Sequence, residues 1–113
     1  MSVSLQRMES LALRELSLIL RKDAKNNYLS NITVTEVRIT NDLSYMTIFY
    51  TFYQGKEENY QAALENCKGY IRSELAKKLK ARKMPELIFK RDEALEYGNH
   101  INELLASLNK KEY

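Results

Sequence analysis

Apolar residues recur at helical spacing along the first part of the chain. They are Leu5, Met8, Ala12, Leu16 and Ile19, with arginines at other positions around the helical wheel. Residues three or four positions apart share one face of a helix, so the pattern predicts an amphipathic helix of about four to five turns. The polar residues 23–27 suit a turn, and the helix should end there.

Two strand patterns follow. Ile32–Ile39 is rich in β-branched residues and predicts one strand, and residues 45–53 predict a second. Residues 40–44 supply the turn of an antiparallel hairpin. The alternation of apolar and polar positions slips between Val34 and Val37, which indicates a β-bulge near Glu36.

Helical spacing returns after Gly55 in two stretches. The first covers residues 56–67 and the second begins near Gly69. Their apolar sides consist of Tyr60, Ala63, Leu64 and Cys67, and then of Ile71, Leu75, Ala76 and Leu79. Because glycine inside a helix costs roughly 1 kcal/mol relative to alanine, we expect two helices that meet at a kink at Gly69.

Pro85 ends the helical region, because proline interrupts helical hydrogen bonding. Residues 87–91 then predict a short third strand. A final helix is predicted from Ile101, Leu104, Leu105 and Leu108, followed by a frayed tail at residues 109–113. The element order predicts a single α+β domain over residues 1–113, ordered from about residue 4 to 108, with helices on one face of a three-stranded sheet.

Length and composition narrow the class of protein. A chain of 113 residues suits one domain with one modest core. It has no apolar run of about 20 residues, and Arg7, Glu9 and Arg14 interrupt any secretory start, so we expect a soluble protein without a membrane span. The single cysteine, Cys67, excludes an internal disulfide and favours the cytoplasm.

The charge is distributed unevenly. The net charge is only +3, but residues 68–91 hold nine basic and two acidic residues, a local charge of +7. The rest of the chain holds nine basic and thirteen acidic residues, or −4. Such asymmetry in a small domain indicates a positive face directed at a polyanion.

Catalytic and cofactor chemistry is poorly supported. His100 is the only histidine and Cys67 the only cysteine, so a metal site built from several such ligands is not available. The three glycines are too far apart for a phosphate-binding loop. We therefore expect no enzyme, no cofactor, no metal and no small-molecule substrate.

Several fragments of the chain resemble one family in the correct order. They are RMESLALRELSLIL at residues 7–20, VTEV at 34–37 with NDLS at 41–44, GYIRSEL at 69–75, MPELIF at 84–89 and DEALEYG at 92–98. They are similar to the bacterial ribosome-binding factor A family, over about residues 7 to 105. The resemblance implies a type II K-homology (KH) fold, a class of RNA-binding module.

The resemblance also implies a function. The family binds the small ribosomal subunit and 16S rRNA during late subunit assembly and is tied to cold adaptation. It replaces the usual KH loop by a helix-kink-helix centred on Ala-x-Gly, where this chain has Cys67, Lys68 and Gly69. A small cysteine should be tolerated there. The family's Asp-Pro-Arg pattern is replaced by Asn26, Asn27 and Tyr28, so any phosphate contact that the family's arginine makes is lost here, and Tyr28 can at most stack.

The candidate RNA-binding residues form two groups. The first lies at the kink and comprises Lys68, Gly69 and Arg72. The second lies at the end of the third helix and in the loop before Pro85, and comprises Lys77, Lys78, Lys80, Arg82 and Lys83. Cations of either group suit RNA phosphates. Alternatively, the kink only packs two helices on the sheet. The second group then only complements a helix dipole, with Glu74 paired to Lys78.

The second strand has two aromatic faces. Met46, Ile48, Tyr50 and Phe52 share one, and Tyr45, Phe49 and Tyr53 share the other. The resemblance implies that the face of Met46 and Ile48 points inward. The opposite face then offers rings for base stacking, or serves ordinary strand packing.

Two other classes of function compete with RNA binding. A protein–protein adaptor would use the basic face to bind an acidic partner. A small enzyme would need a pair such as Cys67 and His100, which nothing else in the sequence supports. The reading we favour is a monomeric assembly factor whose partners are 16S rRNA and the small ribosomal subunit.

Overall fold

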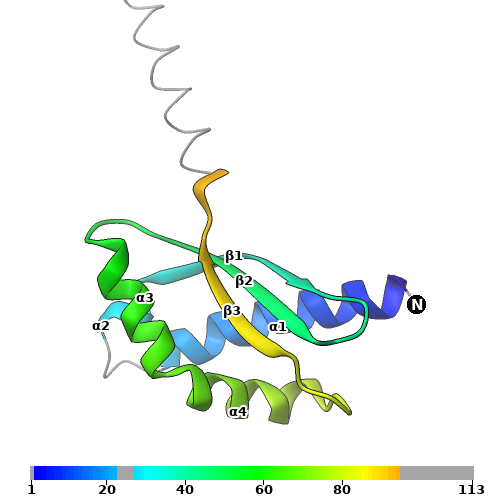
Figure 1. Cartoon of the computed structure of the whole chain (residues 1–113). Helices are drawn as coiled ribbons and strands as arrows, with labels where there is room; N and C mark the ends of the chain where they lie inside the picture. Colours follow the sequence, from blue (N-terminus) through cyan, green and yellow to red (C-terminus); the bar gives the residue numbers. More distant parts are fainter. Residues whose placement is uncertain (1, 23–26, 95–113) are drawn as a thin grey trace, which may run out of the picture.

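One three-stranded sheet carries its helices on a single face in the computed structural model (Figure 1). The structure describes residues 2–22 and 27–94. The elements are α1 (Ser2–Lys22), α2 (Asn27–Ser30), β1 (Ile32–Ile39), β2 (Tyr45–Phe52), α3 (Glu57–Asn66), α4 (Lys68–Leu79) and β3 (Glu86–Arg91). This arrangement confirms the α+β class. The predicted final helix lies outside the described residues.

The sheet is mixed. β1 pairs antiparallel with β2, as the hairpin prediction required, and β3 lies parallel to β2 on its other side. Parallel neighbours need a long crossover connection, which α3 and α4 provide. The β1–β2 register shifts between Val34 and Glu36, so Thr35 is the extra residue of a bulge. Val34 and Val37 are both buried as a result, which confirms the predicted bulge.

The N-terminal part of the chain differs from expectation in two ways. α1 has 21 residues, longer than the four to five turns predicted, because its first turn lies ahead of the apolar repeat. The Glu9 carboxylate on α1 accepts a hydrogen bond of 2.8 Å from the backbone N–H of Ile39, which ties the helix to β1. The short helix α2 was not predicted, and its Leu29 is buried. No helix among the described residues has the length and apolarity needed to cross a bilayer.

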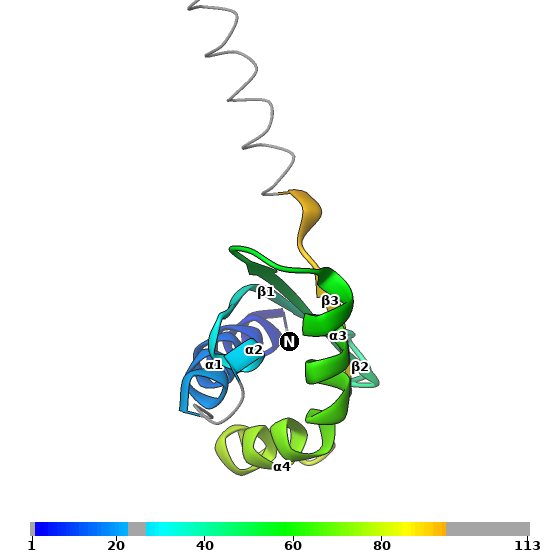
Figure 2. The same ribbon diagram turned by 90° about the vertical axis from the view of Figure 1, so that its left-hand side faces the viewer.

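The core lies between the sheet and the helices, where α1 and α4 run side by side (Figure 2). Its fully buried members include Ala12, Leu16, Met46, Ile48, Tyr50, Ile71, Leu75 and Leu87. The face of Met46 and Ile48 is therefore the inward one, as expected. The Tyr50 hydroxyl donates a 2.6 Å hydrogen bond to Gln61, so its polar atom has a partner.

Gly55 lies in the connection between β2 and α3 and has a backbone conformation that only glycine adopts easily. Its φ is +116°, and a Cβ added there would lie 3.0 Å from Cε2 of Tyr60. We expect Gly55→Ala to lower the free energy of unfolding by about 1–3 kcal/mol, because both strain and overlap are introduced. Urea unfolding followed by circular dichroism measures this. An unchanged midpoint would contradict the prediction.

Candidate nucleic-acid interface

The kink between α3 and α4 is a single residue wide. Cys67 has φ −100° and ψ 4°, outside the helical values. Its N–H still donates to the carbonyl of Ala63 at 3.1 Å, and its own carbonyl accepts from Ile71 at 2.9 Å. Its side chain is partly buried against the core, which suits a small cysteine at this position. The backbone thus turns without losing the hydrogen bonds on either side.

Gly69 lies in the first turn of α4 and is exposed. Its φ is not positive, and a Cβ added there would meet no atom within 4 Å. The fold therefore does not require glycine at this position, in contrast to Gly55. Glycine at this exposed position would instead allow a binding partner to approach the backbone closely.

Gly69→Ala should change stability and binding in opposite directions. We expect a gain of about 0.5 kcal/mol in the free energy of unfolding, since alanine is the better helix former. We also expect weaker RNA binding, because the methyl group stands where the RNA backbone would approach. Urea unfolding and RNA titration of the same preparation check both. Equal or tighter binding by the alanine variant would contradict an RNA contact here.

Lys68 and Arg72 are already engaged within the protein. Lys68 Nζ lies 2.9 Å from the Glu65 carboxylate and 5.8 Å from the centre of the Phe89 ring. Arg72 donates from Nη2 to the carbonyl of Met84 at 2.7 Å and from Nε to that of Pro85 at 3.3 Å. Arg72 thereby holds the loop before β3 against α4. This role was missed, because backbone acceptors across a loop leave no mark in a sequence.

Arg72→Lys tests that role while keeping the charge. We expect the free energy of unfolding to fall by about 1 kcal/mol, because a lysine does not reproduce the two-pronged contact with the loop carbonyls. RNA affinity should also fall as the loop loosens. The matched control is Arg38→Lys, because the Arg38 side chain is 72% exposed and, among the described residues, bonds only to Glu36 on the same strand. Thermal unfolding compares them; equal Tm values would contradict the prediction.

The second group of cations is exposed at the end of α4 and in the following loop. We call it the basic cluster: Lys77, Lys78, Lys80, Arg82 and Lys83. Lys77 bonds to Glu74 at 2.8 Å, so the predicted pairing of Glu74 with Lys78 is wrong. The hydrogen bond and charge of Lys77 lower the pKa of Glu74 and, in return, Glu74 raises the pKa of Lys77. Within the described residues, no ion pair or hydrogen bond holds the side chains of the other four.

Lys80 has a left-handed backbone, with φ 52° and ψ 34°, where it ends α4. Its N–H donates to the carbonyl of Ala76 at 3.2 Å. Glycine is the usual residue at such a helix end, and a side chain there costs roughly 1 kcal/mol. A lysine thus stands at a position where stability alone favours glycine, which points to a use for its charge.

The basic cluster lies at the end of the sheet where β2 begins. The backbone N–H of Glu86 donates to the carbonyl of Ser44 at 2.9 Å, which joins the loop after α4 to the β1–β2 turn. In that turn, hydrogen bonds from Thr40 and Ser44 lower the pKa of Asp42 to about 2, with a further contribution from Lys83. Asp42 is therefore ionised, and its negative charge lies next to the basic cluster at Lys83.

The site offers binding chemistry rather than a reaction centre. Among residues 2–22 and 27–94, no three His, Cys, Asp or Glu side chains gather where they would hold a metal ion. Exposed lysines and arginines around a glycine-lined bend suit a phosphate backbone, to which they donate hydrogen bonds and supply positive charge.

Comparison with known proteins gives a consistent result. The profile of the family described as ribosome-binding factor A matches residues 4–105. Ribosome-binding factor A of Lactobacillus acidophilus is 45% identical over 109 residues, covering 94% of this chain and 90% of that protein. The protein of the same name from Enterococcus faecalis is 43% identical over 103 residues, covering 88% and 89%.

Solved structures share the fold. The crystal structure of ribosome-binding factor A from Thermus thermophilus superposes with a TM-score of 0.70 at 23% identity, covering 77% of this chain and 94% of that one. A homology model of the Thermus thermophilus factor, fitted into a cryo-EM map of a complex of the 30S subunit with the factor, gives a TM-score of 0.57 at 20% identity, covering 79% of this chain and 91% of that one. Because the family profile matches residues 4–105 of this 113-residue chain, the chain belongs to the ribosome-binding factor A family.

Proposed function

We propose that this protein binds the free small (30S) ribosomal subunit through its 16S rRNA in the cytoplasm. There it promotes late assembly of the subunit and maturation of the rRNA, including at low temperature, as a monomer and without catalysing a reaction. Membership of a family of ribosome-binding factors supports this proposal. A relative from Thermus thermophilus has been fitted into a map of a 30S complex, which supports it further.

The observation that carries the proposal is the basic cluster. Five exposed cations lie within residues 77–83, at the end of α4 and in the following loop, and four of them form no ion pair or hydrogen bond with a described residue through their side chains. Cations that only stabilised the fold would be expected to pair with nearby acids. Phosphates of rRNA are the partners that such a surface suits, because their neutralisation releases counterions.

The kink supplies the second element of the proposed contact. The exposed Gly69 leaves open space beside the partly exposed Lys68 and the guanidinium of Arg72. Only two of the roughly five N–H donors of Arg72 are used on the loop carbonyls, so the others remain for phosphate. Arg72 in this proposal both shapes the loop and contacts RNA.

Gradient sedimentation of a cell lysate tests the proposal. We expect the protein to travel with free small subunits, not with complete ribosomes, and to be removed by high salt. A protein that stays at the top of the gradient at low salt would refute it. A pull-down that keeps its partner after nuclease treatment would instead indicate a protein–protein adaptor.

A further inference from the structure

One face of the sheet is left open by the described helices, which pack on the other face (Figure 1). We call the open side the outer face. On β2 it carries Tyr45, Thr47, Phe49 and Thr51, which alternate with the buried residues of that strand. Tyr45 is 46% exposed, and the other three are partly exposed. The described residues therefore leave the outer side of the middle strand in contact with solvent.

The outer face has an apolar stripe with charged borders. The register places Ile88 of β3 beside Thr47, so Tyr45, Phe49 and Ile88 lie together, and we call these three residues the apolar stripe. The charged residues on either side of it are Glu36 and Arg38 on β1 and Glu86 and Lys90 on β3. A sheet face that meets only water commonly carries polar side chains on its middle strand as well. An apolar stripe between charged borders instead suits the apolar side of an amphipathic helix.

The chain leaves the sheet over this outer face. After β3, the N–H of Asp92 donates to the carbonyl of Tyr50 at 2.7 Å, and its carboxylate accepts a 2.6 Å hydrogen bond from the hydroxyl of Thr35 on β1. Because β2 lies between β1 and β3, the second bond spans β2. It does so on the outer face, because the Tyr50 side chain at the same level is buried on the inner one. The Thr35 hydroxyl also lies 3.3 Å from the carbonyl of Phe49, so the described chain ends close to the apolar stripe.

The β-bulge explains how Thr35 reaches Asp92. Thr35 is the extra residue of the bulge and has no partner in the register with β2. A bulge re-aims the side chain of its extra residue, which here points across the sheet. The carboxylate of Asp92 also accepts from the N–H of Ala94 at 3.2 Å, which turns the chain just after this contact. The direction in which the chain continues is thus set by contacts within the described residues.

The chain that continues from there has a suitable length and pattern. Residues 95–113 follow, and their apolar positions at helical spacing are Ile101, Leu104, Leu105 and Leu108. A helix over residues 101–108 is about 12 Å long. The apolar stripe extends over about 13 Å of strand from Tyr45 to Phe49. Residues 95–100 span up to about 20 Å when extended, which is enough to bring the helix back over the stripe.

We propose that residues 101–108 form a helix that docks on the outer face, with its four apolar side chains against the apolar stripe. Burial of apolar surface drives the docking, and the contact between Asp92 and Thr35 directs the chain toward the stripe. The sheet then lies between two layers of helix. The rings of Tyr45 and Phe49 serve packing in this arrangement, not base stacking. The proposal rests on the sheet and does not depend on the proposed function.

Nuclear Overhauser effects in the full chain test the docking. We expect cross-peaks between the side chains of Leu104 or Leu105 and those of Phe49 and Ile88. A sample that mixes isotope-labelled and unlabelled chains separates contacts within one chain from contacts between two copies. Absence of these cross-peaks overturns the proposal. Cross-peaks that arise only between labelled and unlabelled chains also overturn it, because they identify a second copy of the chain as the occupant.

A charge on the docking side of the segment should release it. We expect Leu105→Asp to remove the cross-peaks to Ile88 and to shift the backbone amide signals of β2, because an unpaired carboxylate is costly to bury against the stripe. Ser107→Asp is the matched control, since it adds the same charge on the opposite side of the predicted helix. Neither position belongs to the described core, so both variants should keep the fold. Equal effects of the two variants overturn the proposal.

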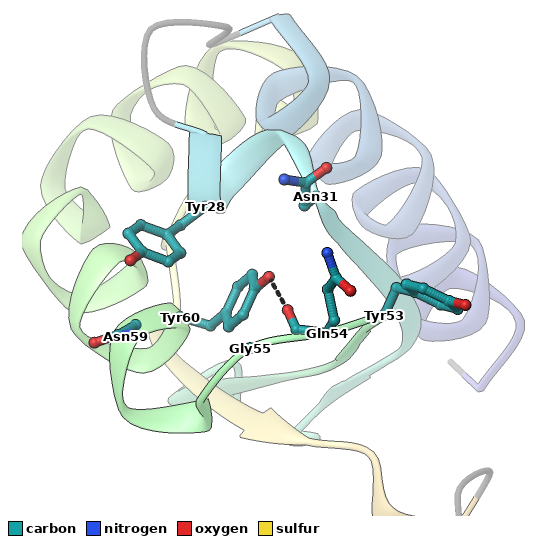
Figure 3. A pocket seen from close by; sticks show the side chains of 7 residues that line it. All are labelled: Tyr28, Asn31, Tyr53, Gln54, Gly55, Asn59 and Tyr60. Atoms are coloured by element: carbon teal, nitrogen blue, oxygen red, sulfur yellow. Dashed lines mark hydrogen bonds between the residues drawn. The ribbon is translucent and has the colours of Figure 1, made fainter.

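A pair of variants on the sheet tests the docking surface itself. Phe49→Ala should remove the cross-peaks between Leu105 and Ile88, whereas Tyr53→Ala should leave them in place. Tyr53 lies past the end of β2, is 96% exposed and lines a separate hollow of about 520 Å³ with Tyr60, from which its ring points away (Figure 3). If Tyr53→Ala releases the segment and Phe49→Ala does not, the segment docks at that hollow and the proposal is wrong.

Discussion

Replacing Lys80, Arg82 and Lys83 by glutamine is expected to weaken binding to the small ribosomal subunit by about 100-fold at 0.15 M salt. Each phosphate contact contributes roughly 0.7–0.9 to the log–log salt slope, so one contact is worth a factor of about five at this salt relative to 1 M. Three contacts multiply to about 100-fold, and the slope should become shallower by about two to three.

These three residues are the sharpest choice within the basic cluster. Their side chains are exposed, and no ion pair or hydrogen bond with a described residue holds them, so their replacement should leave the fold intact. Lys77 is less suitable because its bond to Glu74 would also be lost. Circular dichroism and urea unfolding of the variant should match those of the parent.

A second triple variant separates a local site from a general charge effect. Arg7, Arg14 and Arg21 are exposed on α1, and replacing them by glutamine changes the net charge by the same amount. Affinity is measured for both variants over a range of salt concentrations with purified small subunits. If the α1 variant loses as much affinity as the loop variant, the basic cluster is not the binding surface.

Leu75→Ala is expected to lower the free energy of unfolding by about 3 kcal/mol. Leu75 is fully buried on the inner face of α4, in the same core as Leu16 of α1 and Met46 of β2. Truncation removes the burial of three carbons and leaves a cavity that a packed core fills only in part. Tm should fall by more than about 10 °C in a domain of this size.

The matched control is Leu18→Ala, the same change at a position that is 40% exposed on α1. It should cost less than about 1 kcal/mol, since a large part of the residue already meets solvent. Urea unfolding gives both values from one assay. A cost below 1 kcal/mol at Leu75 would mean that α4 is not packed as the structure has it.

Much of the fold was predictable because its signals are local. The apolar repeat of Ala12, Leu16 and Ile19 marks the buried face of α1, and these residues are buried. The slip between Val34 and Val37 marks the bulge, because a one-residue insertion must shift the alternation. The kink beside Gly69 was also visible in the sequence, although its turning residue proved to be Cys67.

The candidate site was predictable as a region but not residue by residue. The charge of residues 68–91 predicted a basic segment, since net charge along the chain needs no tertiary information, and five of its cations are exposed at the end of α4 and in the following loop. Side-chain partners do need it. Glu74 pairs with Lys77 and not with Lys78. Pairs three and four residues apart are both favourable on a helix, and side-chain rotamers decide between them.

What the sequence determined by itself is the set of elements, their buried faces, the basic segment and the family resemblance, all of which rest on neighbouring residues or on short motifs. Only the tertiary structure decided that β3 lies parallel beside β2, that Arg72 holds the carbonyls of Met84 and Pro85, and that Tyr28, Tyr53 and Tyr60 enclose one hollow. Each of these brings together segments of the chain more than ten positions apart. Such contacts depend on how several buried faces are satisfied at once, and no local pattern records that outcome.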